Sequence, residues 1–276
     1  RVKVNGKGSK RDVRLAVGDV LQLYINDEFF ETPKQENAYL TVAAPKLNIV
    51  YEDADLLVVN KPAGMVVHPG HGNYSGTLLN AIAYYLRDEQ HFDPSDPRLG
   101  LVHRIDKDTS GLLVIAKTPE AKSNLGLQFY HHTTKRCYRA VVWGQFQEDE
   151  GTVVGNIGRS PKDRLQMTVF PEGDQGKHAV THYRVLERLG YVTLVECRLE
   201  TGRTHQIRVH MASIGHPLLG DDTYTAAKPP YRLTGQTLHA RVLGFIHPRT
   251  GQYVEFEAPL PDYFTKILAD LQKKQH

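Results

Sequence analysis

Residues 101–117 read Leu-Val-His-Arg-Ile-Asp-Lys-Asp-Thr-Ser-Gly-Leu-Leu-Val-Ile-Ala-Lys, so a group of charged residues stands directly before an apolar run. Residues 112–116 are apolar and uninterrupted, which predicts a strand buried on both faces. Residues 103–111 would then form a loop at the mouth of a core strand. Loops held in place by a rigid sheet are where binding and catalytic residues are concentrated.

This loop contains two carboxylates, Asp106 and Asp108, with His103, Arg104 and Lys107 close to them in the sequence. Neighbouring cations favour the ionised form of a carboxylate. The simpler alternative is a solvated turn with local ion pairs, and such pairs contribute little to stability. Charge pattern alone favours that alternative.

The same stretch resembles the signature His-Arg-(Leu/Ile)-Asp-x-x-Thr-Ser-Gly-(Leu/Val) of the RluA/RluC/RluD-type pseudouridine synthases. The first Asp of that signature is the catalytic nucleophile of the family, so the resemblance gives this role to Asp106. It also implies that Arg104 supports the active site. Asp108 is interpreted as a loop residue.

Two further segments are similar to motifs of this family. Residues 135–142 read Lys-Arg-Cys-Tyr-Arg-Ala-Val-Val, and Tyr138 stands where the family has a tyrosine that stacks on the target base. An aromatic face beside cations suits an unstacked base and its phosphates, although a solvated edge strand is the alternative. Residues 199–210 match a motif that lines the pocket, which implies that Leu199 supports it and that Arg208 pairs with Asp106.

Zinc is a competing interpretation of the last motif, because His205 and His210 stand close together. No acidic residue lies at the spacing of a known metal motif, so we expect no metal site. The resemblance likewise implies a reaction without metal or organic cofactor, in which uridine in RNA is isomerised to pseudouridine.

The fold expected from the resemblance is α/β (α+β), with a long mixed, mainly antiparallel sheet, flanking helices and a central catalytic cleft. Periodicity predicts strands at 56–59, 180–189 and 191–199, and helices that begin after Thr77 and Thr118. Residues 151–177 combine Gly, Pro and basic residues, which suggests a mobile insertion. Lys61 and His68 lie in a segment that packs beside the active site in the family.

Before this domain, residues 1–14 contain six basic residues and one acidic residue, a net charge of +5 in a chain whose total is +3. Such a concentration is typical of a nucleic-acid-binding arm. Asn5-Gly6 predicts a tight hairpin turn. The pattern is similar to the second half of a small RNA-binding module shared with ribosomal small-subunit protein four, without its leading helices, and we expect the chain to be part of a longer protein.

We therefore divide the chain into a partial RNA-binding module at 1–30, a Pro-punctuated acidic linker at 31–46 and a catalytic domain at 47–276. The residues predicted to contact RNA are Arg1, Lys3, Lys7, Lys10, Arg11, Arg14, Lys135, Arg136, Arg159 and Arg203.

Two cysteines, Cys137 and Cys197, show no pairing motif, and no apolar run approaches the ~20 residues that a membrane span needs. We expect a cytoplasmic monomer that does not enter membranes. The closest motifs are those of the RluD branch, which implies large-subunit ribosomal RNA or its precursor as partner, in the helix 69 region of 23S RNA. The alternatives are a synthase of the same family that acts on transfer RNA or another ribosomal site, and a non-catalytic RNA-binding or ribosome-assembly factor.

Overall fold

The computed structural model describes residues 2–8, 16–23, 46–70, 73, 75–90, 93, 96, 98–163, 166–170 and 175–274. The chain divides into two compact units, Arg1–Ala38 and Tyr39–His276. Four of the basic candidates, Arg1, Lys10, Arg11 and Arg14, lie outside the described residues, and so does almost all of the predicted linker.

The first unit contains a small antiparallel sheet with the strand order β2-β1-β3. Its strands are β1 Val2–Val4, β2 Lys7–Gly8 and β3 Leu21–Leu23. Asn5 and Gly6 join the first two strands with φ angles of 51° and 78°, the left-handed values that a two-residue hairpin turn requires. The Asn5 side chain also accepts a hydrogen bond from the backbone N–H of Val20 at 2.8 Å. The predicted hairpin is confirmed.

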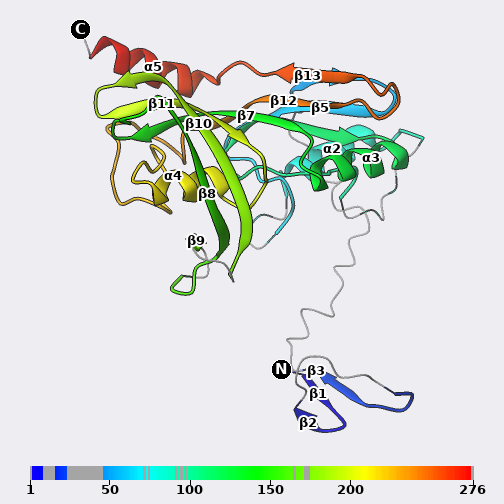
Figure 1. Ribbon diagram of the computed structural model, residues 1–276. Helices are drawn as coiled ribbons and strands as arrows, with labels where there is room; N and C mark the ends of the chain where they lie inside the picture. Colours follow the sequence, from blue (N-terminus) through cyan, green and yellow to red (C-terminus); the bar gives the residue numbers. More distant parts are fainter. Residues whose placement is uncertain are drawn as a thin grey trace. The chain divides into compact units, whose positions relative to one another are not determined.

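A ten-stranded sheet forms the second unit, with the strand order β4-β5-β6-β12-β7-β11-β10-β8-β9 and β13 paired to β12 (Figure 1). Among the described strand pairings of this sheet, only that of β6 with β12 is parallel. The mixed, mainly antiparallel sheet expected from the sequence is therefore present. The strands are β4 Ile49–Glu52, β5 Leu56–Lys61, β6 Ser110–Ala116, β7 Lys135–Trp143, β8 Glu150–Arg159, β9 Met167–Phe170, β10 Lys177–Leu189, β11 Val192–Leu199, β12 Leu238–Ile246 and β13 Tyr253–Glu257.

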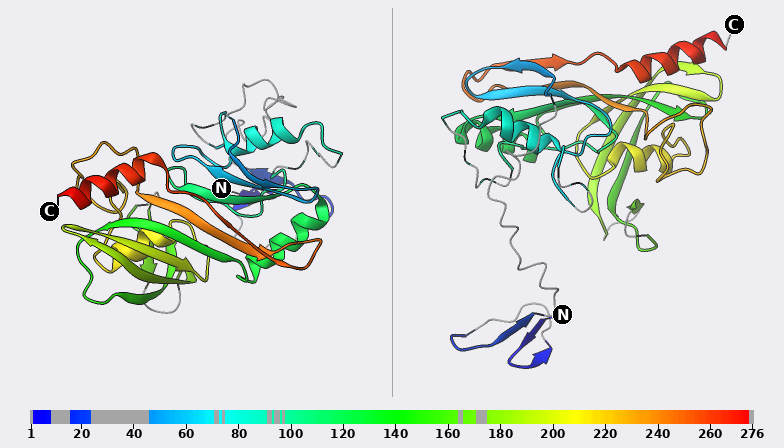
Figure 2. Two further views of the ribbon diagram at one scale, coloured as in Figure 1. Left: turned by 90° about the horizontal axis from the view of Figure 1, so that it is seen from above. Right: turned by 180° about the vertical axis from the view of Figure 1, so that it is seen from behind.

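In the part of the chain that the structure describes, the helices that flank this sheet are α2 Leu78–Leu86, α3 Pro119–Tyr130, α4 Gln206–Ser213 and α5 Asp262–Lys273. Thr77 and Thr118 cap α2 and α3 as predicted, because each hydroxyl accepts a hydrogen bond from a first-turn backbone N–H. In the view from above, β12 runs toward the end of α3 (Figure 2). There the Gln128 side chain donates a hydrogen bond to the carbonyl of Ile246 and accepts one from the backbone N–H of the same residue. None of the described helices is long and apolar enough to cross a membrane.

The central strand β6 is buried along its whole length, as its apolar sequence predicted. Because side chains alternate along a strand, Leu113 and Ile115 enter the cluster that contains α2 and α4 residues, while Leu112 and Val114 enter the cluster that contains α3 residues. The loop before β6 is thus anchored to a strand that is packed on both faces.

The prediction of a mobile insertion at 151–177 is wrong for residues 151–159 and 167–170, whereas 164, 165 and 171–174 lie outside the described residues. Residues 150–159 form β8, whose residues 150–157 pair with β10, and 167–170 form β9, which pairs with the end of β8. Val153 and Ile157 are buried on alternate positions of β8. Glycine suggested a loop here, but Gly155 instead allows close packing, since a Cβ at this position would lie 2.5 Å from the Val169 side chain.

Acid is expected to destabilise this fold through two fully buried histidines, His210 and His239. Burial lowers the pKa of each to about 4, whereas a histidine in an unfolded chain titrates near 6.5. Between these values the unfolded chain binds protons that the folded chain does not bind, so the free energy of unfolding falls as the pH falls. The loss by pH 4 is on the order of 3 kcal/mol per histidine.

Urea unfolding between pH 7 and pH 4.5 would measure this dependence. His239 contacts the Ser110 hydroxyl at 2.9 Å and the Ala258 carbonyl at 3.4 Å. His239→Gln keeps hydrogen-bonding groups at the position but cannot titrate, so its unfolding free energy should fall less steeply with acid. Equal slopes for the variant and the wild type would contradict this assignment.

Candidate active site

The loop before β6 borders a cavity of about 670 Å³, and Asp106 forms part of the cavity wall. The Asp106 side chain is 19% exposed. Tyr138 of β7, Leu199 at the end of β11 and Leu238 at the start of β12 line the same cavity. Segments far apart in the sequence therefore meet around one half-buried carboxylate.

Hydrogen bonds hold the Asp106 loop against the sheet. The backbone N–H of Thr109 donates to the carbonyl of Asp106 at 3.2 Å, and Gln236 donates to the Thr109 hydroxyl at 3.0 Å. The start of β6 needs glycine: Gly111 has a φ of 117°, and a Cβ there would lie 2.2 Å from the carbonyl oxygen of Ala240 on β12. The Thr-Ser-Gly part of the motif therefore fits the loop to the parallel β6 and β12 pair.

Lys61 clamps the other side of this loop. Its side chain is almost fully buried, and Nζ donates to the carbonyls of Pro62, Met65 and Lys107 at 2.8, 2.8 and 2.9 Å. Burial lowers the pKa of Lys61 to about 7, while the charges of Asp108 and Asp106 act in the opposite direction. Three carbonyl acceptors match the three donors of an ammonium group, so the geometry favours the charged form.

Arg208 of α4 contacts Asp106, with 3.3 Å between Nη1 and Oδ2. The expected pairing of these two residues is therefore present. The bidentate fork of the guanidinium, however, faces a different carboxylate: Nε and Nη2 donate to Asp221 at 2.7 and 2.8 Å. Nη2 also donates to the Thr223 hydroxyl at 2.9 Å. Asp221 thus receives the bidentate contact of Arg208, and Asp106 receives a single one.

The pair of Arg208 and Asp221 lies deep in the protein, with side-chain exposures of 8% and 0%. Burial opposes the charge on Arg208, but Asp221 and then Asp106 more than compensate and raise its pKa above the ordinary value. Arg208 is consequently a permanent cation that is oriented by one carboxylate and directed at a second. Asp106 receives a single contact from it and keeps acceptor capacity facing the cavity.

The start of α4 is positioned by the turn that follows β11. Gln206 bonds the Thr201 hydroxyl at 2.8 Å and donates to the carbonyl of Val180 on β10 at 2.9 Å. His205 enters the helix with a φ of 55° and contacts the Tyr224 hydroxyl at 2.8 Å. α4 lies against β8, β9 and β10 (Figure 1). The helix that carries Arg208 is therefore tied to the sheet at its first turn.

Tyr138 is 9% exposed and borders the cavity. Burial raises its pKa to about 12, with Arg136 acting against the shift and Asp106 adding to it. At neutral pH the side chain is a neutral phenol, and an aromatic ring in this position can stack on a planar base.

The other predicted site residues divide into two groups. Arg104, Arg136 and Arg203 line the cavity. Lys135 and Arg159 are exposed residues outside the cavity lining, and Lys135 pairs with Glu255 at 2.9 Å. Lys3 belongs to the first unit, and His68 of the second unit does not line the cavity.

Sequence reasoning missed three features of the site. The first is Asp221, which follows Arg208 by 13 residues, and this proximity to the Arg208 motif was the available signal. The rings of His103 and Phe129 stack at a centroid distance of 4.2 Å and form another wall of the cavity. His132, which also lines it, follows α3 with a φ of 58° and carried no sequence signal.

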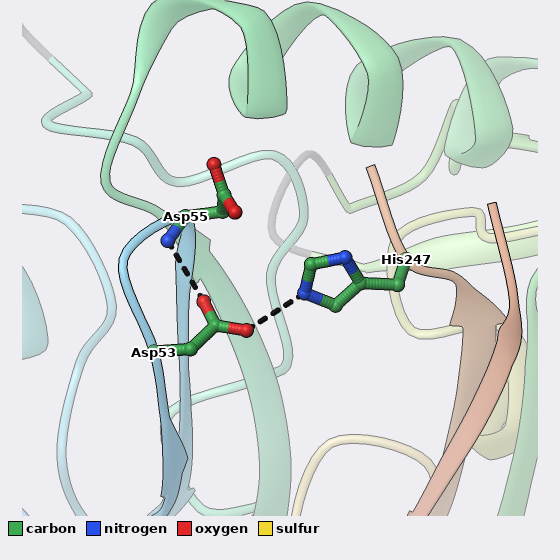
Figure 3. Close-up of side chains that lie close together, drawn as sticks. All are labelled: Asp53, Asp55 and His247. Carbon is green, nitrogen blue, oxygen red and sulfur yellow. Dashed lines mark hydrogen bonds and ion pairs between the residues drawn. The ribbon is translucent and has the colours of Figure 1, made fainter. Parts of the chain in front are cut away.

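Among the described residues, one group of side chains has ligand atoms close enough together to hold a metal ion (Figure 3). It consists of Asp53, Asp55 and His247. Each already has protein partners. His247 Nε2 contacts Asp53 at 2.7 Å, while its Nδ1 accepts the backbone N–H of Arg249 at 3.2 Å. Asp55 receives both Nε and Nη2 of Arg249, at 2.5 and 2.6 Å. Because Nδ1 of His247 accepts a hydrogen bond, its Nε2 carries the proton. The three side chains therefore connect the β12–β13 turn to the β4–β5 hairpin.

Comparisons with known proteins agree on one family. Residues 55–213 match the RNA pseudouridylate synthase family. The uncharacterized RNA pseudouridine synthase YlyB of Bacillus subtilis is 48% identical over 273 residues, which cover 99% of this chain and 86% of the relative. Ribosomal large subunit pseudouridine synthase D of Zymomonas mobilis is 51% identical over 222 residues, 78% of this chain and 69% of that protein.

Among solved structures, human RNA pseudouridylate synthase domain containing 4 matches with a TM-score of 0.65 at 26% identity, over 82% of this chain and 93% of that one. Human RNA pseudouridylate synthase domain containing 1 matches with a TM-score of 0.62 at 28% identity, over 82% and 95%. The matched region contains Asp106, Tyr138 and Arg208. This chain belongs to the RNA pseudouridylate synthase family.

Proposed function

We propose that this RNA pseudouridine synthase modifies uridines of large-subunit ribosomal RNA, with Asp106 as its nucleophile. The observation that carries the proposal is the half-buried Asp106 carboxylate, held against Arg208 on the wall of a 670 Å³ cavity. That volume lies within the usual range of small-molecule sites, so it accommodates a flipped nucleotide. We place the enzyme in the cytoplasm as a monomer, and we assign no metal or organic cofactor to its chemistry.

The reaction conserves every atom of the substrate. The bond from N1 of uracil to C1′ of the ribose breaks, the uracil turns, and C5 bonds to C1′, while the proton on C5 leaves and N1 gains a proton. A carboxylate suits this sequence because it can add covalently or stabilise positive charge that develops on the sugar. Asp106 performs one of these roles and Arg208 keeps it oriented.

The target base must leave its stack to enter the cavity, which costs a few kcal/mol. Stacking on the Tyr138 ring offsets part of that cost. Leu199 and Leu238 supply apolar walls beside the ring. The site therefore recognises a planar pyrimidine by its faces and presents its sugar to Asp106.

The ribosomal target rests on the relatives. Proteins named ribosomal large subunit pseudouridine synthase D align with this chain at 43% identity over 98% of its length in Neisseria meningitidis and at 51% over 78% in Zymomonas mobilis. Within that RNA we propose the helix 69 region of 23S RNA, and the alternatives are transfer RNA and another ribosomal site.

Incubation of the purified protein with a 23S helix 69 stem–loop, with other 23S fragments and with transfer RNA transcripts would distinguish these targets. Pseudouridine is mapped by carbodiimide modification and primer extension. The proposal expects product in the helix 69 stem–loop first, and the same positions should lack pseudouridine in cells without the protein. Faster conversion of transfer RNA would assign the enzyme to that substrate instead.

Deletion of residues 1–25 is expected to weaken RNA binding and to reduce its dependence on salt. This segment carries the +5 charge of residues 1–14. If three of its basic side chains contact phosphates of a single strand, the slope of log affinity against log salt should become shallower by about 2. The turnover rate at saturating RNA serves as the control, since the catalytic residues lie in the other unit. An unchanged slope would show that this segment does not bind RNA.

A further inference from the structure

Arg136 is a buried cation without a carboxylate partner. It is 7% exposed, and its one described hydrogen bond runs from Nη2 to the carbonyl of Glu200 at 3.2 Å. Its Nε has no hydrogen-bond partner among the residues that the structure describes, and none of the described carboxylates pairs with it. Burial of a charged group is costly unless the group is paired. Arg136 therefore lacks a counter-charge that its position calls for.

The position of Arg136 relates it to the reacting base. It lies two residues before Tyr138 on β7, and both side chains line the cavity that Asp106 borders. Residues two apart on a strand project from the same face, roughly 7 Å from each other. The Arg136 side chain is thus the neighbour, on the same face of β7, of the Tyr138 ring on which the flipped base would stack.

Gly202 and the Phe129 ring lie close to the Arg136 guanidinium. A Cβ at Gly202 would lie 2.5 Å from Nη1 of Arg136, so glycine at this position makes space for the side chain. The Phe129 ring contributes an aromatic face 5.9 Å from Arg136 Cζ. The turn that contains Gly202 therefore packs directly around the Arg136 guanidinium.

Arg203 and His132 also line the cavity, and both lie near enough to Arg136 to interact with it electrostatically. Burial, followed by the charges of Arg136 and Arg203, lowers the pKa of His132. Arg203 is held in place by a hydrogen bond from Nε to the carbonyl of His178 at 2.9 Å. The two guanidinium groups and the imidazole therefore present N–H donors around one site where an anion would relieve the repulsion.

We propose that Arg136, together with Arg203 and His132, forms a subsite for the phosphodiester next to the target nucleotide. The inference rests on the proposed function, because the anion meant is part of the RNA whose uridine meets Asp106. Arginine suits this role, since its planar fork binds phosphate oxygens in two parallel hydrogen bonds. Contacts of this kind fix the register of the RNA without reading its sequence. The subsite would hold the strand while the base turns beside Tyr138.

The test is a neutral-phosphate scan. Methylphosphonates replace one phosphate at a time in the RNA, ribosomal or transfer, that the wild-type enzyme isomerises fastest, and binding is measured in the Asp106→Asn background so that the RNA is not converted. We expect one position, adjacent to the modified uridine, where neutralisation weakens binding about tenfold. Arg136→Met should weaken binding to the unmodified RNA by a similar factor, lower the salt slope by about 0.7 and abolish the sensitivity at that position.

Arg139→Met is the matched control, because Arg139 lies on the same strand, is ion-paired with Glu196 and does not line the cavity. It should keep both the tenfold sensitivity and the salt slope. Arg136→Lys retains a charge and should keep part of the sensitivity, and Arg203→Met should reduce it at the same position, so the test does not depend on the folding of one variant.

The scan and the target assay fail in different ways. Preference for transfer RNA would overturn the ribosomal target and leave the scan interpretable, because it uses whichever RNA is converted. A scan in which no phosphate distinguishes Arg136→Met from Arg139→Met would overturn the subsite. Arg136 would then be a packing residue of the Glu200 turn.

Discussion

Asp106→Asn is expected to reduce pseudouridine formation by roughly a thousandfold or more, while RNA affinity stays within a few-fold. The amide keeps the shape of the side chain but cannot act as a nucleophile or stabilise positive charge on the sugar. Arg208 retains its fork to Asp221, so the cation remains in place. The loss should therefore fall on the chemical step, and single-turnover conversion of a 23S fragment would measure it.

Asp108→Asn is the matched control, two residues away in the same loop. Asp108 is half-buried but does not line the cavity, and its side chain packs where a Cβ at Gly235 would lie. Its conversion should change activity by no more than a few-fold. Near-normal turnover by Asp106→Asn, or equal losses in the two variants, would remove Asp106 from the nucleophile's role.

The parts of the fold that could be predicted are those whose causes are local. The apolar run at 112–116 is stable only when it is removed from water, and β6 is buried throughout. Threonine before a helical pattern is a cap because its hydroxyl satisfies a free N–H, as at Thr77 and Thr118. Asn5-Gly6 adopts positive φ angles at low cost, which is why the hairpin could be located.

The parts that could not be predicted depend on contacts between distant segments. From the sequence alone Gly155 suggests a loop, whereas in the structure it makes room for Val169 on the neighbouring strand. Asp221 reaches Arg208 because the segment before it is fastened to β7, where the N–H of Leu219 donates to the carbonyl of Val141 at 2.8 Å. No local pattern indicates which of two carboxylates receives the fork of an arginine.

That choice of partner has a large expected consequence for stability. Arg208→Met should lower the free energy of unfolding by about 3–5 kcal/mol, because it leaves the fully buried Asp221 carboxylate without its charge partner. The N–H of Thr223 still donates to Asp221 at 3.0 Å, but one backbone donor does not replace two guanidinium bonds. Activity should also be lost, since Asp106 loses its only described cationic contact.

The double variant Arg208→Met/Asp221→Asn separates the two effects. Removal of the second charge relieves the burial penalty, so urea unfolding should return most of the lost stability. Pseudouridine formation should stay low, because no guanidinium then orients Asp106. Recovery of activity together with stability would show that Arg208 acts only through the fold. A single Arg208→Met variant as stable as the wild type would instead show that Asp221 is not an obligatory anion. If stability recovers and activity does not, Arg208 has two separate roles: it neutralises the buried Asp221 and it orients Asp106.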